Sequence, residues 1–263
     1  FKNEPTSELF GTLGYLTNLS LRKANGLNKH FLTPKMLLRY SPGSMRKEKS
    51  GSRLDPTSAF DLSRLNKIDN FETGLTGTLG FDYKIKNNSQ DFNISAAQIF
   101  NEKENKKMSS VSSLDEKNSD LVGAVSATLN KNINLSYNFN LDQNYKDVNY
   151  SDIGTQMNFG ALNINFNYLK EQKHIGNNNY FKSKISLRNN DNGLFTFETK
   201  RNLITDSSEF YDLSYEYIND CLRAGLVYRR EFYNDSELES ENSLLFKITL
   251  IPFGNVNSPT INR

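Results

Sequence analysis

The chain has 263 residues and a formal net charge of +2, with 36% hydrophobic and 12% aromatic residues. The near balance of 32 basic and 30 acidic residues argues against a dedicated nucleic-acid binder, which would carry a clear basic excess. No stretch approaches about 18 consecutive apolar residues, which argues against a transmembrane helix. The composition is compatible with a membrane β-barrel, whose strands need an apolar residue only at every second position.

The dominant pattern along the chain is a strict alternation of apolar and polar residues, which is typical of strands with one apolar face. From Ile133 to Leu141, every second residue is apolar and the residues between are Asn or Ser. We therefore predict about thirteen strands and essentially no helix. Pro34 falls inside the second strand, where its missing N–H predicts a bulge or weak pairing. The predicted strands are 8–22, 29–41, 70–86, 91–103, 118–130, 132–145, 148–158, 161–170, 179–189, 193–202, 208–218, 221–233 and 241–252.

The connections between these strands alternate between tight and long links. The tight links are rich in Asn, Asp and Gly, as hairpin turns require. Many strands reach the roughly 9–11 residues that a tilted strand needs to cross a bilayer. Both features favour a bacterial outer-membrane barrel, with tight periplasmic turns and long outer loops. The long links are 42–69, 104–117, 171–178 and 234–240, and we expect the charged stretch 46–49 to be a solvated part of the first.

Periodicity alone does not separate a membrane barrel from a soluble one, because the polar face contacts water in both. A soluble Asn-rich adhesin of β-sandwich type therefore remains an alternative, as does an outer-membrane hydrolase. The hydrolase would need a nucleophile beside a histidine, and the two histidines, His30 and His174, share no motif. We expect no catalytic residue, no metal site and no cofactor.

Cys221 is the single cysteine, so no disulfide can form within the chain. Two interpretations stay open for it. It is either a small buried hydrophobe or the partner of a cysteine outside this chain.

Several segments in a fixed order resemble the C-terminal barrel region of the lipopolysaccharide-assembly family LptD, also called the organic solvent tolerance family. The run 64–74 is similar to a family stretch in Arg64, Asp69, Glu72 and Gly74, and it departs from that stretch at Ser63, Lys67 and Asn70. Gln98 lies in a second similar segment, 97–100. The run 215–225 resembles a late Tyr-x-x-Cys hairpin, although many members carry two adjacent cysteines there. The closing run 245–250 resembles the last strand.

This resemblance implies an all-β, antiparallel outer-membrane β-barrel, of which residues 1–252 would form the C-terminal portion. The Gly, Asn and Pro residues that follow Pro252 predict a flexible tail over 253–263. It implies a component of the cell outer membrane of Gram-negative bacteria that inserts lipopolysaccharide into the outer leaflet through a lumen and a lateral seam. Such a protein is a transporter and not an enzyme. The implied partners are lipopolysaccharide, an LptE-like plug lipoprotein and an LptA-like periplasmic bridge that acts through an N-terminal domain. The alternative is a generic outer-membrane porin or receptor barrel.

The resemblance also assigns roles to individual residues. Cys221 would form a disulfide with a cysteine outside this chain, at the periplasmic end of the barrel. The last strand would form one side of the lateral seam, and it places four apolar residues on its lipid-facing side: Leu244, Phe246, Ile248 and Leu250.

Overall fold

The computed structural model describes residues 10–49, 51–65, 67, 70–189, 192–232 and 241–250, together with the backbone of 254–257 and 261–262. The chain folds as two compact units. Unit 1 comprises Phe1–Ala127, Tyr137–Ser151 and Glu171–Asn177, and unit 2 comprises Thr128–Ser136, Asp152–Lys170 and Asn178–Arg263. Within the described residues, we find no helix that is long and apolar enough to cross a membrane.

The regular structure consists of strands in antiparallel pairs and two short 3-10 helices. The hydrogen-bonded order runs from β1 through β3 to β15 in sequence, while β2 pairs with β3 and β16 pairs with β14. The predicted all-β antiparallel architecture is confirmed. The elements are β1 (Leu13–Asn18), β2 (Leu21–Asn25), β3 (Asn28–Ser41), η1 (Ser58–Phe60), β4 (Gly74–Lys86), β5 (Asp91–Asn101), η2 (Ser110–Ser112), β6 (Leu121–Asn130), β7 (Ile133–Leu141), β8 (Val148–Phe159), β9 (Leu162–Glu171), β10 (Asn178–Asn189), β11 (Gly193–Asn202), β12 (Ser207–Ile218), β13 (Leu222–Glu231), β14 (Glu241–Leu250), β15 (Gly254–Asn257) and β16 (Ile261–Asn262).

The first predicted strand, 8–22, is divided into β1 and β2, which both pair with β3. The division lies opposite Pro34, whose carbonyl accepts a hydrogen bond from the backbone N–H of Leu19 at 3.1 Å. In an antiparallel ladder the N–H and C=O of one residue point to the same neighbour. Because proline has no N–H, the ladder is interrupted on this side, whereas β3 and β4 pair without a break.

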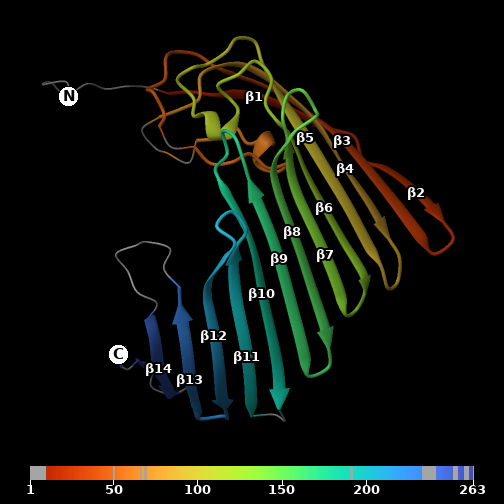
Figure 1. The fold of residues 1–263 in the computed structure, drawn as a ribbon. Coiled ribbons are helices and arrows are strands. Elements are labelled where there is room, and N and C mark those ends of the chain that lie inside the picture. Colours follow the sequence, from red (N-terminus) through yellow and green to blue (C-terminus); the bar gives the residue numbers. More distant parts are fainter. Residues whose placement is uncertain are drawn as a thin grey trace, which may run out of the picture. The chain divides into compact units, whose positions relative to one another are not determined.

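One face of unit 2 is a continuous apolar surface. The pairing registers place five large residues in one row across β10 to β14, and each has between 38% and 54% of its surface exposed. Soluble monomers rarely expose a contiguous apolar patch of this kind. We therefore expect this face to contact apolar surroundings and not water. The row consists of Ile185, Phe197, Leu213, Tyr228 and Leu244 (strands labelled in Figure 1).

The opposite face of unit 2 carries a row of charged residues, which lie one position before or after the apolar residues along each strand. Lys184, Glu198, Asp212 and Arg229 are cross-strand partners along β10 to β13. Successive residues of a strand point to opposite faces, so a shift of one residue exchanges the apolar row for this charged row. The predicted alternation therefore holds in unit 2 with one apolar and one polar face.

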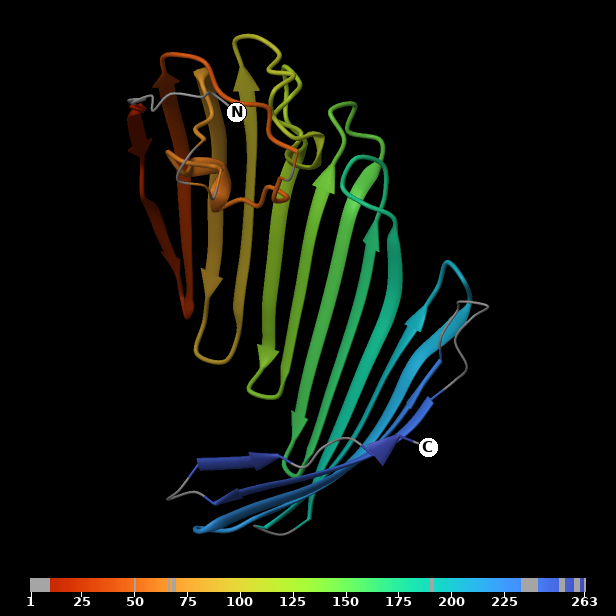
Figure 2. The ribbon, with the colours of Figure 1, turned by 90° about the vertical axis from the view of Figure 1, so that its left-hand side faces the viewer.

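In unit 1 the face that carries Arg39, Thr78 and Ile99 is covered by the links that follow β3 and β5 (Figure 2). Link residues Leu54 and Ala59 are 4% and 0% exposed. The hydroxyl of Thr78 donates to the carbonyl of Ala59 at 3.1 Å, which fixes η1 on β4. The strand alternation predicts that the polar face contacts water. That prediction is wrong for this part of the sheet, because apolar link residues exclude water from it.

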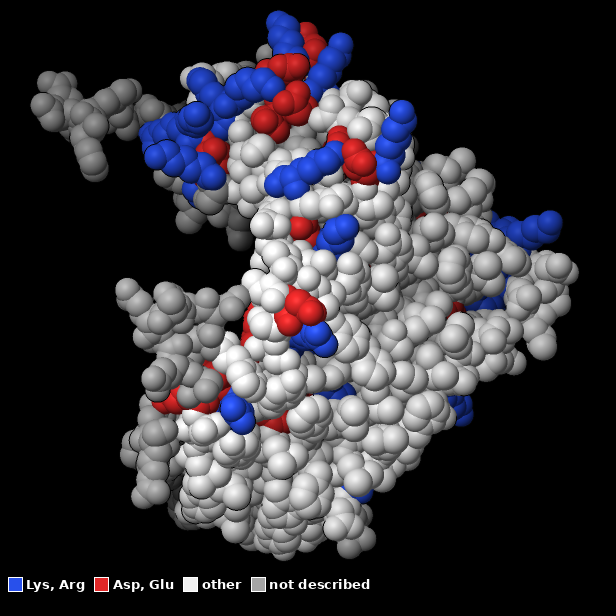
Figure 3. Space-filling view, in the orientation of Figure 1, with Lys and Arg blue, Asp and Glu red and all other residues white. Residues whose placement is uncertain are grey.

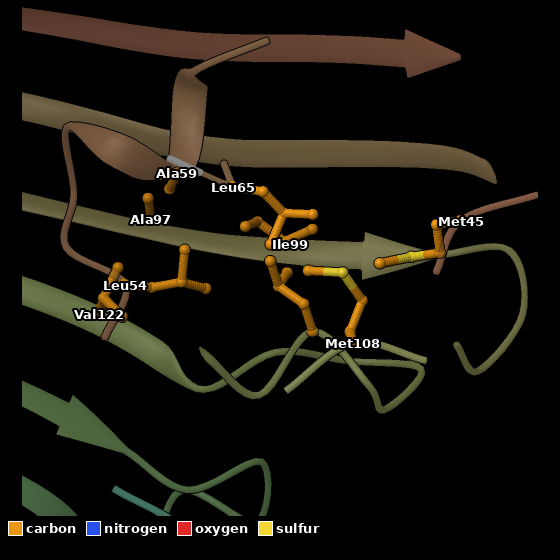
Figure 4. Packing of buried hydrophobic residues seen from close by; sticks show 9 residues of the cluster. Met45, Leu54, Ala59, Leu65, Ala97, Ile99, Met108 and Val122 are labelled. Atoms are coloured by element: carbon orange, nitrogen blue, oxygen red, sulfur yellow. The ribbon is translucent and has the colours of Figure 1, made fainter. Parts of the chain in front are cut away.

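The covered face holds the apolar core of unit 1. Strand residues from β5 and β6 meet residues from both links, and Figure 4 shows their side chains directed toward one another. A backbone hydrogen bond of 2.7 Å from Glu48 to Lys107 joins the two links beside this core. The core residues are Met45, Leu54, Ala59, Leu65, Ala97, Ile99, Met108, Leu114 and Val122.

The stretch 46–49 was expected to be solvated, and for Glu48 this is wrong. Glu48 is 5% exposed, and Lys67 contacts its carboxylate at 2.6 Å. The amide of Asn70 reaches the other carboxylate oxygen at 3.3 Å. A buried carboxylate needs such partners, and they come from residues about twenty positions later in the same link.

The range 253–263 contains two short strands, where we expected a flexible tail. β15 pairs with β14 at Lys247 to Leu250, and β16 pairs with β14 at Ser243 and Leu244. The division of the chain at residue 252 stays a prediction.

Candidate functional site

The centre of the covered face in unit 1 is a carboxylate shared by two arginines. Arg39 comes from β3, Arg64 from the following link, and Glu72 from the end of that link. Nε of Arg64 lies 2.9 Å from Oε2 of Glu72, and Nη1 of Arg39 lies 3.7 Å from Oε1. Each of the three residues is at most 7% exposed. We call these residues the Arg39–Glu72–Arg64 cluster.

Hydrogen bonds to the backbone orient the cluster. Arg39 donates from Nε to the carbonyl of Leu62 and from Nη2 to the carbonyl of Glu72, both at 2.7 Å. Arg64 donates from Nη2 to the hydroxyl of Thr76 on β4 at 2.7 Å. Arg39 therefore ties the strand to two points of the link, and Arg64 ties the link back to the sheet.

The charges of the cluster depend on one another. Burial lowers the pKa of Arg64, and the carboxylate of Glu72 opposes that shift. A charge in a low-dielectric interior is costly unless it is paired and hydrogen-bonded. Glu72 thus makes it possible to bury two guanidinium groups beneath the link.

The structure brings together some of the family-motif residues and separates others. Arg64 and Glu72 meet, and Gly74 follows them with φ = 116°, a left-handed conformation that favours glycine. Asp69 lies outside the described residues. Gln98 takes no part in the cluster, since its amide donates to the carbonyl of Ser119 at 3.0 Å and its side-chain carbonyl accepts from the hydroxyl of Tyr145 at 2.7 Å. The functional roles of these residues stay predictions.

Arg39 was missed as a site residue by sequence reasoning. A signal for it existed: an arginine stands on a strand at the position before Tyr40 and shares a face with Leu37. Strand alternation gives the face, but it does not give the carboxylate 33 residues later that neutralises the charge.

A second polar cluster joins three links of unit 1. Nε2 of His174 lies 3.0 Å from Oδ2 of Asp120, and the amide of Asn149 donates to the same oxygen at 3.1 Å. Next to His174, Lys173 bridges Asp142 at 2.5 Å and Asp147 at 2.7 Å. The hydrogen bond to Asp120 raises the pKa of His174 above its ordinary value, against the effect of burial. Figure 3 shows charged side chains gathered over the links of unit 1.

The charged row of unit 2 is internally paired. Lys184 contacts Glu198 at 3.1 Å, and Lys182 contacts the other oxygen of Glu198 at 2.7 Å. Arg229 makes a two-point contact with Asp212, with distances of 2.7 and 2.6 Å. The result is a polar surface on which two neighbouring carboxylates are flanked and paired by basic side chains.

The remaining predicted site residues lie in unit 2. Cys221 is an exposed free thiol in the turn between β12 and β13, where Oδ1 of Asn219 accepts hydrogen bonds from the N–H groups of Cys221 and Leu222. The four predicted seam residues lie on β14. Leu244, Phe246 and Leu250 are exposed and Ile248 is half-buried. The disulfide and the seam stay predictions.

In the part of the chain that the structure describes, no three His, Cys, Asp or Glu side chains come together as metal ligands would.

Comparison of the sequence with protein families gives a match to the family described as LptD, LPS transport system D, over residues 21–203. This range spans well over half of the chain and includes the Arg39–Glu72–Arg64 cluster. The chain belongs to the LptD family. Its family is one of lipopolysaccharide transport, as the resemblance predicted. No curated protein matches the sequence of this LptD-family chain.

Comparison of this LptD-family chain with solved structures gives matches to porins. A mutant of the Rh. blastica porin has 11% identity and a TM-score of 0.39, with 94% of this chain and 87% of that chain covered. A triple mutant of the Rhodopseudomonas blastica porin has 10% identity and a TM-score of 0.39, with 95% and 88% covered. Likeness at this level carries no argument about what the chain does.

The Arg39–Glu72–Arg64 cluster leads to a first prediction. Replacing Glu72 by glutamine leaves two buried guanidinium groups without a counter-charge, which should cost about 3–5 kcal/mol of folding free energy. The measurement is the urea midpoint of the full-length protein refolded in detergent. The matched control is Glu116→Gln, which removes the exposed partner of Lys106 and should change the midpoint little. Equal midpoints for the two variants would contradict the role given to Glu72.

A second prediction concerns pH and His174. Because its pKa is raised in the folded protein, the contact with Asp120 stabilises the links fully below the unfolded-state pKa of about 6.5. That stabilisation is lost as the pH rises through the raised folded-state value. Limited proteolysis of the full-length protein should therefore cut the links of unit 1 faster at pH 9 than at pH 6.

The control for this prediction uses the only other histidine. His174→Gln should remove the pH dependence, whereas His30→Gln, which affects a contact with Tyr83 on β4, should retain it. A pH dependence that survives in His174→Gln would show that another group is responsible.

Proposed function

We propose that the chain forms part of an outer-membrane β-barrel that inserts lipopolysaccharide into the outer leaflet of the Gram-negative outer membrane. The family match over residues 21–203 carries this proposal. The two faces of unit 2 support it, because a barrel wall in a bilayer needs an apolar side toward lipid and a polar side toward a wet lumen. The charged row would then line a path for the sugar and phosphate groups.

The lateral exit of the lipid is the step that distinguishes this function from passive diffusion. A lipid with a large polar headgroup can reach the leaflet only if its acyl chains pass between strands while the headgroup remains in the lumen. We assign one side of this seam to β14, with Leu244, Phe246, Ile248 and Leu250 toward lipid, together with the short strands β15 and β16 that pair with its outer edge. A closed barrel requires pairing between its last and first strands, so a weakly paired closure could open there.

The partners proposed for this barrel follow from the family resemblance. They are an LptE-like lipoprotein inside the lumen and an LptA-like bridge that delivers the lipid through a periplasmic N-terminal domain. In the proposed orientation the tight turns face the periplasm and the long links face outward.

The alternative function is a generic outer-membrane porin or receptor barrel. The same two-faced strands would serve it, and it would need neither a seam nor a plug protein. The family match favours lipopolysaccharide transport over this alternative.

A third prediction tests passage of lipopolysaccharide along the polar face. A photoreactive residue placed at Thr196, whose hydroxyl pairs with that of Ser186 on the polar face, should form adducts with newly made, pulse-labelled lipopolysaccharide. These adducts should decline during a chase, because molecules in transit leave the lumen. The neighbouring Phe197, 38% exposed on the apolar face, is the control position, where adducts should accumulate and persist.

Adduct formation at Thr196 and Phe197 also distinguishes lipopolysaccharide transport from the alternative porin function. A porin surrounded by lipopolysaccharide would give adducts at Phe197 and none at Thr196 at any time of the chase. That outcome would refute the transport proposal.

A fourth prediction concerns Cys221, for which we propose a disulfide to a cysteine in the N-terminal part of the full-length protein. The exposed turn is accessible to such a partner, and the periplasm is oxidising. Closing so long a loop would stabilise the fold by roughly 4–5 kcal/mol in the chain-entropy account. Non-reducing electrophoresis of the full-length protein should show a mobility change for Cys221→Ser. Identical mobility, together with free alkylation of Cys221 in native membranes, would exclude the bond.

A further inference from the structure

A cavity of about 370 Å³ lies in unit 2, where β11 ends, β12 begins and β13 ends (β11 to β13 in Figure 1). Its volume is near the lower end of the range for ligand pockets, roughly 300–1,000 Å³. A register shift at Lys200 and Arg201 adds one residue to β12 here and brings Glu209 to the cavity. The lining residues are Asn202, Thr205, Ser207, Glu209, Phe210, Glu231 and Phe232.

Neutral polar groups line one side of the cavity. Oδ1 of Asn202 accepts hydrogen bonds from the backbone N–H groups of Ile204 and Thr205 at 2.9 and 3.3 Å. This fixes the side chain and leaves its amide N–H groups as donors. The hydroxyl groups of Thr205 and Ser207 are 2.8 Å apart, so the pair can both donate to and accept from a ligand.

The charged groups around the cavity argue against an anionic ligand. The two lining carboxylates, Glu209 and Glu231, would repel an anion. The cations beside them are already paired: Lys200 with Glu209 at 2.7 Å, and Arg229 with Asp212 at 2.6 Å and with Glu231 at 3.1 Å. These pairs also reduce the attraction of the carboxylates for a metal ion, which prefers several unshared oxygens.

An aromatic ring completes the lining. Phe210 lies on the same strand face as Asp212, and the guanidinium of Arg229 lies 5.2 Å from its ring centroid. An apolar ring beside an amide, two hydroxyls and paired carboxylates matches a ligand with an apolar C–H face and a rim of hydroxyl groups. A sugar ring has this arrangement, whereas an acyl chain would leave the polar groups unpaired.

We infer that this cavity is a saccharide-binding site, in which Phe210 packs against a sugar ring while Asn202 and Glu209 hydrogen-bond to its hydroxyl groups. Under the proposed function, on which this assignment of a source rests, the ligand is a neutral sugar of the lipopolysaccharide headgroup. A free surface glycan presents the same chemistry and is the other source.

The test uses the full-length protein in lipid nanodiscs and saturation-transfer difference NMR. The probes are the delipidated core oligosaccharide released from the host lipopolysaccharide and, separately, maltoheptaose. We expect the wild-type protein to bind the core oligosaccharide. Phe210→Leu should weaken binding roughly tenfold, the size expected for loss of one ring contact. The matched control is Phe195→Leu on the apolar face of β11, where Phe195 is 44% exposed, and it should bind like the wild type.

A second variant keeps the test decisive if Phe210→Leu fails to fold. Asn202→Asp retains the oxygen that accepts the two backbone hydrogen bonds and removes the amide donors, so it should fold and bind more weakly. Preference for the core oligosaccharide identifies the headgroup as the source, and equal binding of maltoheptaose identifies free glycans; both support a saccharide site.

Three outcomes would overturn the inference. They are no saturation transfer to either saccharide, wild-type affinity in both cavity variants, and displacement of the saccharide by calcium or inorganic phosphate. Failure of lipopolysaccharide transport is read separately, by the adducts at Thr196, because that position does not line the cavity.

Discussion

The sharing of the Glu72 carboxylate between Arg39 and Arg64 is the interaction on which the arrangement of unit 1 depends. Each of these charges would be too costly to bury alone. Together they fasten the second half of the link after β3 to the sheet, and Ala59 and Leu65 of the same link pack in the core above β4 and β5. The apolar core then forms between sheet and link. The electrostatic contact thus specifies where the link lies, and apolar burial supplies most of the stability once it is there.

Strand alternation gives both units one polar face, but the surroundings of that face differ between the two units. In unit 2 the polar face carries a row of paired charges, and its net charge is small. Under the proposed function, such a face would hydrate a headgroup without binding it tightly. In unit 1 the equivalent positions are occupied by link residues and exclude water. The same alternation therefore gives a polar face that carries paired charges in unit 2 and a polar face that is covered by links in unit 1.

Much of the fold could be predicted because its signals are local. The alternation from Ile133 to Leu141 predicts a strand with one apolar face, and β7 spans these residues, although the predicted strand 132–145 extended into the following link. Pro34 predicts a weakness in pairing, and the break between β1 and β2 lies opposite it. The link after β3 could not be predicted in this way. Its charged stretch 46–49 looks solvated, and Glu48 is buried only because Lys67 and Asn70 return to it.

The sequence by itself determined the strands, the face on which each side chain lies and the family to which the chain belongs, since period and motif order are properties of neighbouring residues. Tertiary structure alone decided that Arg39 meets Glu72, that Asp120 meets His174 and that a cavity forms beside Phe210. These contacts join residues from different strands and links. Their formation depends on the pairing register of the strands and on the free-energy cost of leaving a buried charge unpaired. Neither quantity can be predicted from the residues of one segment alone.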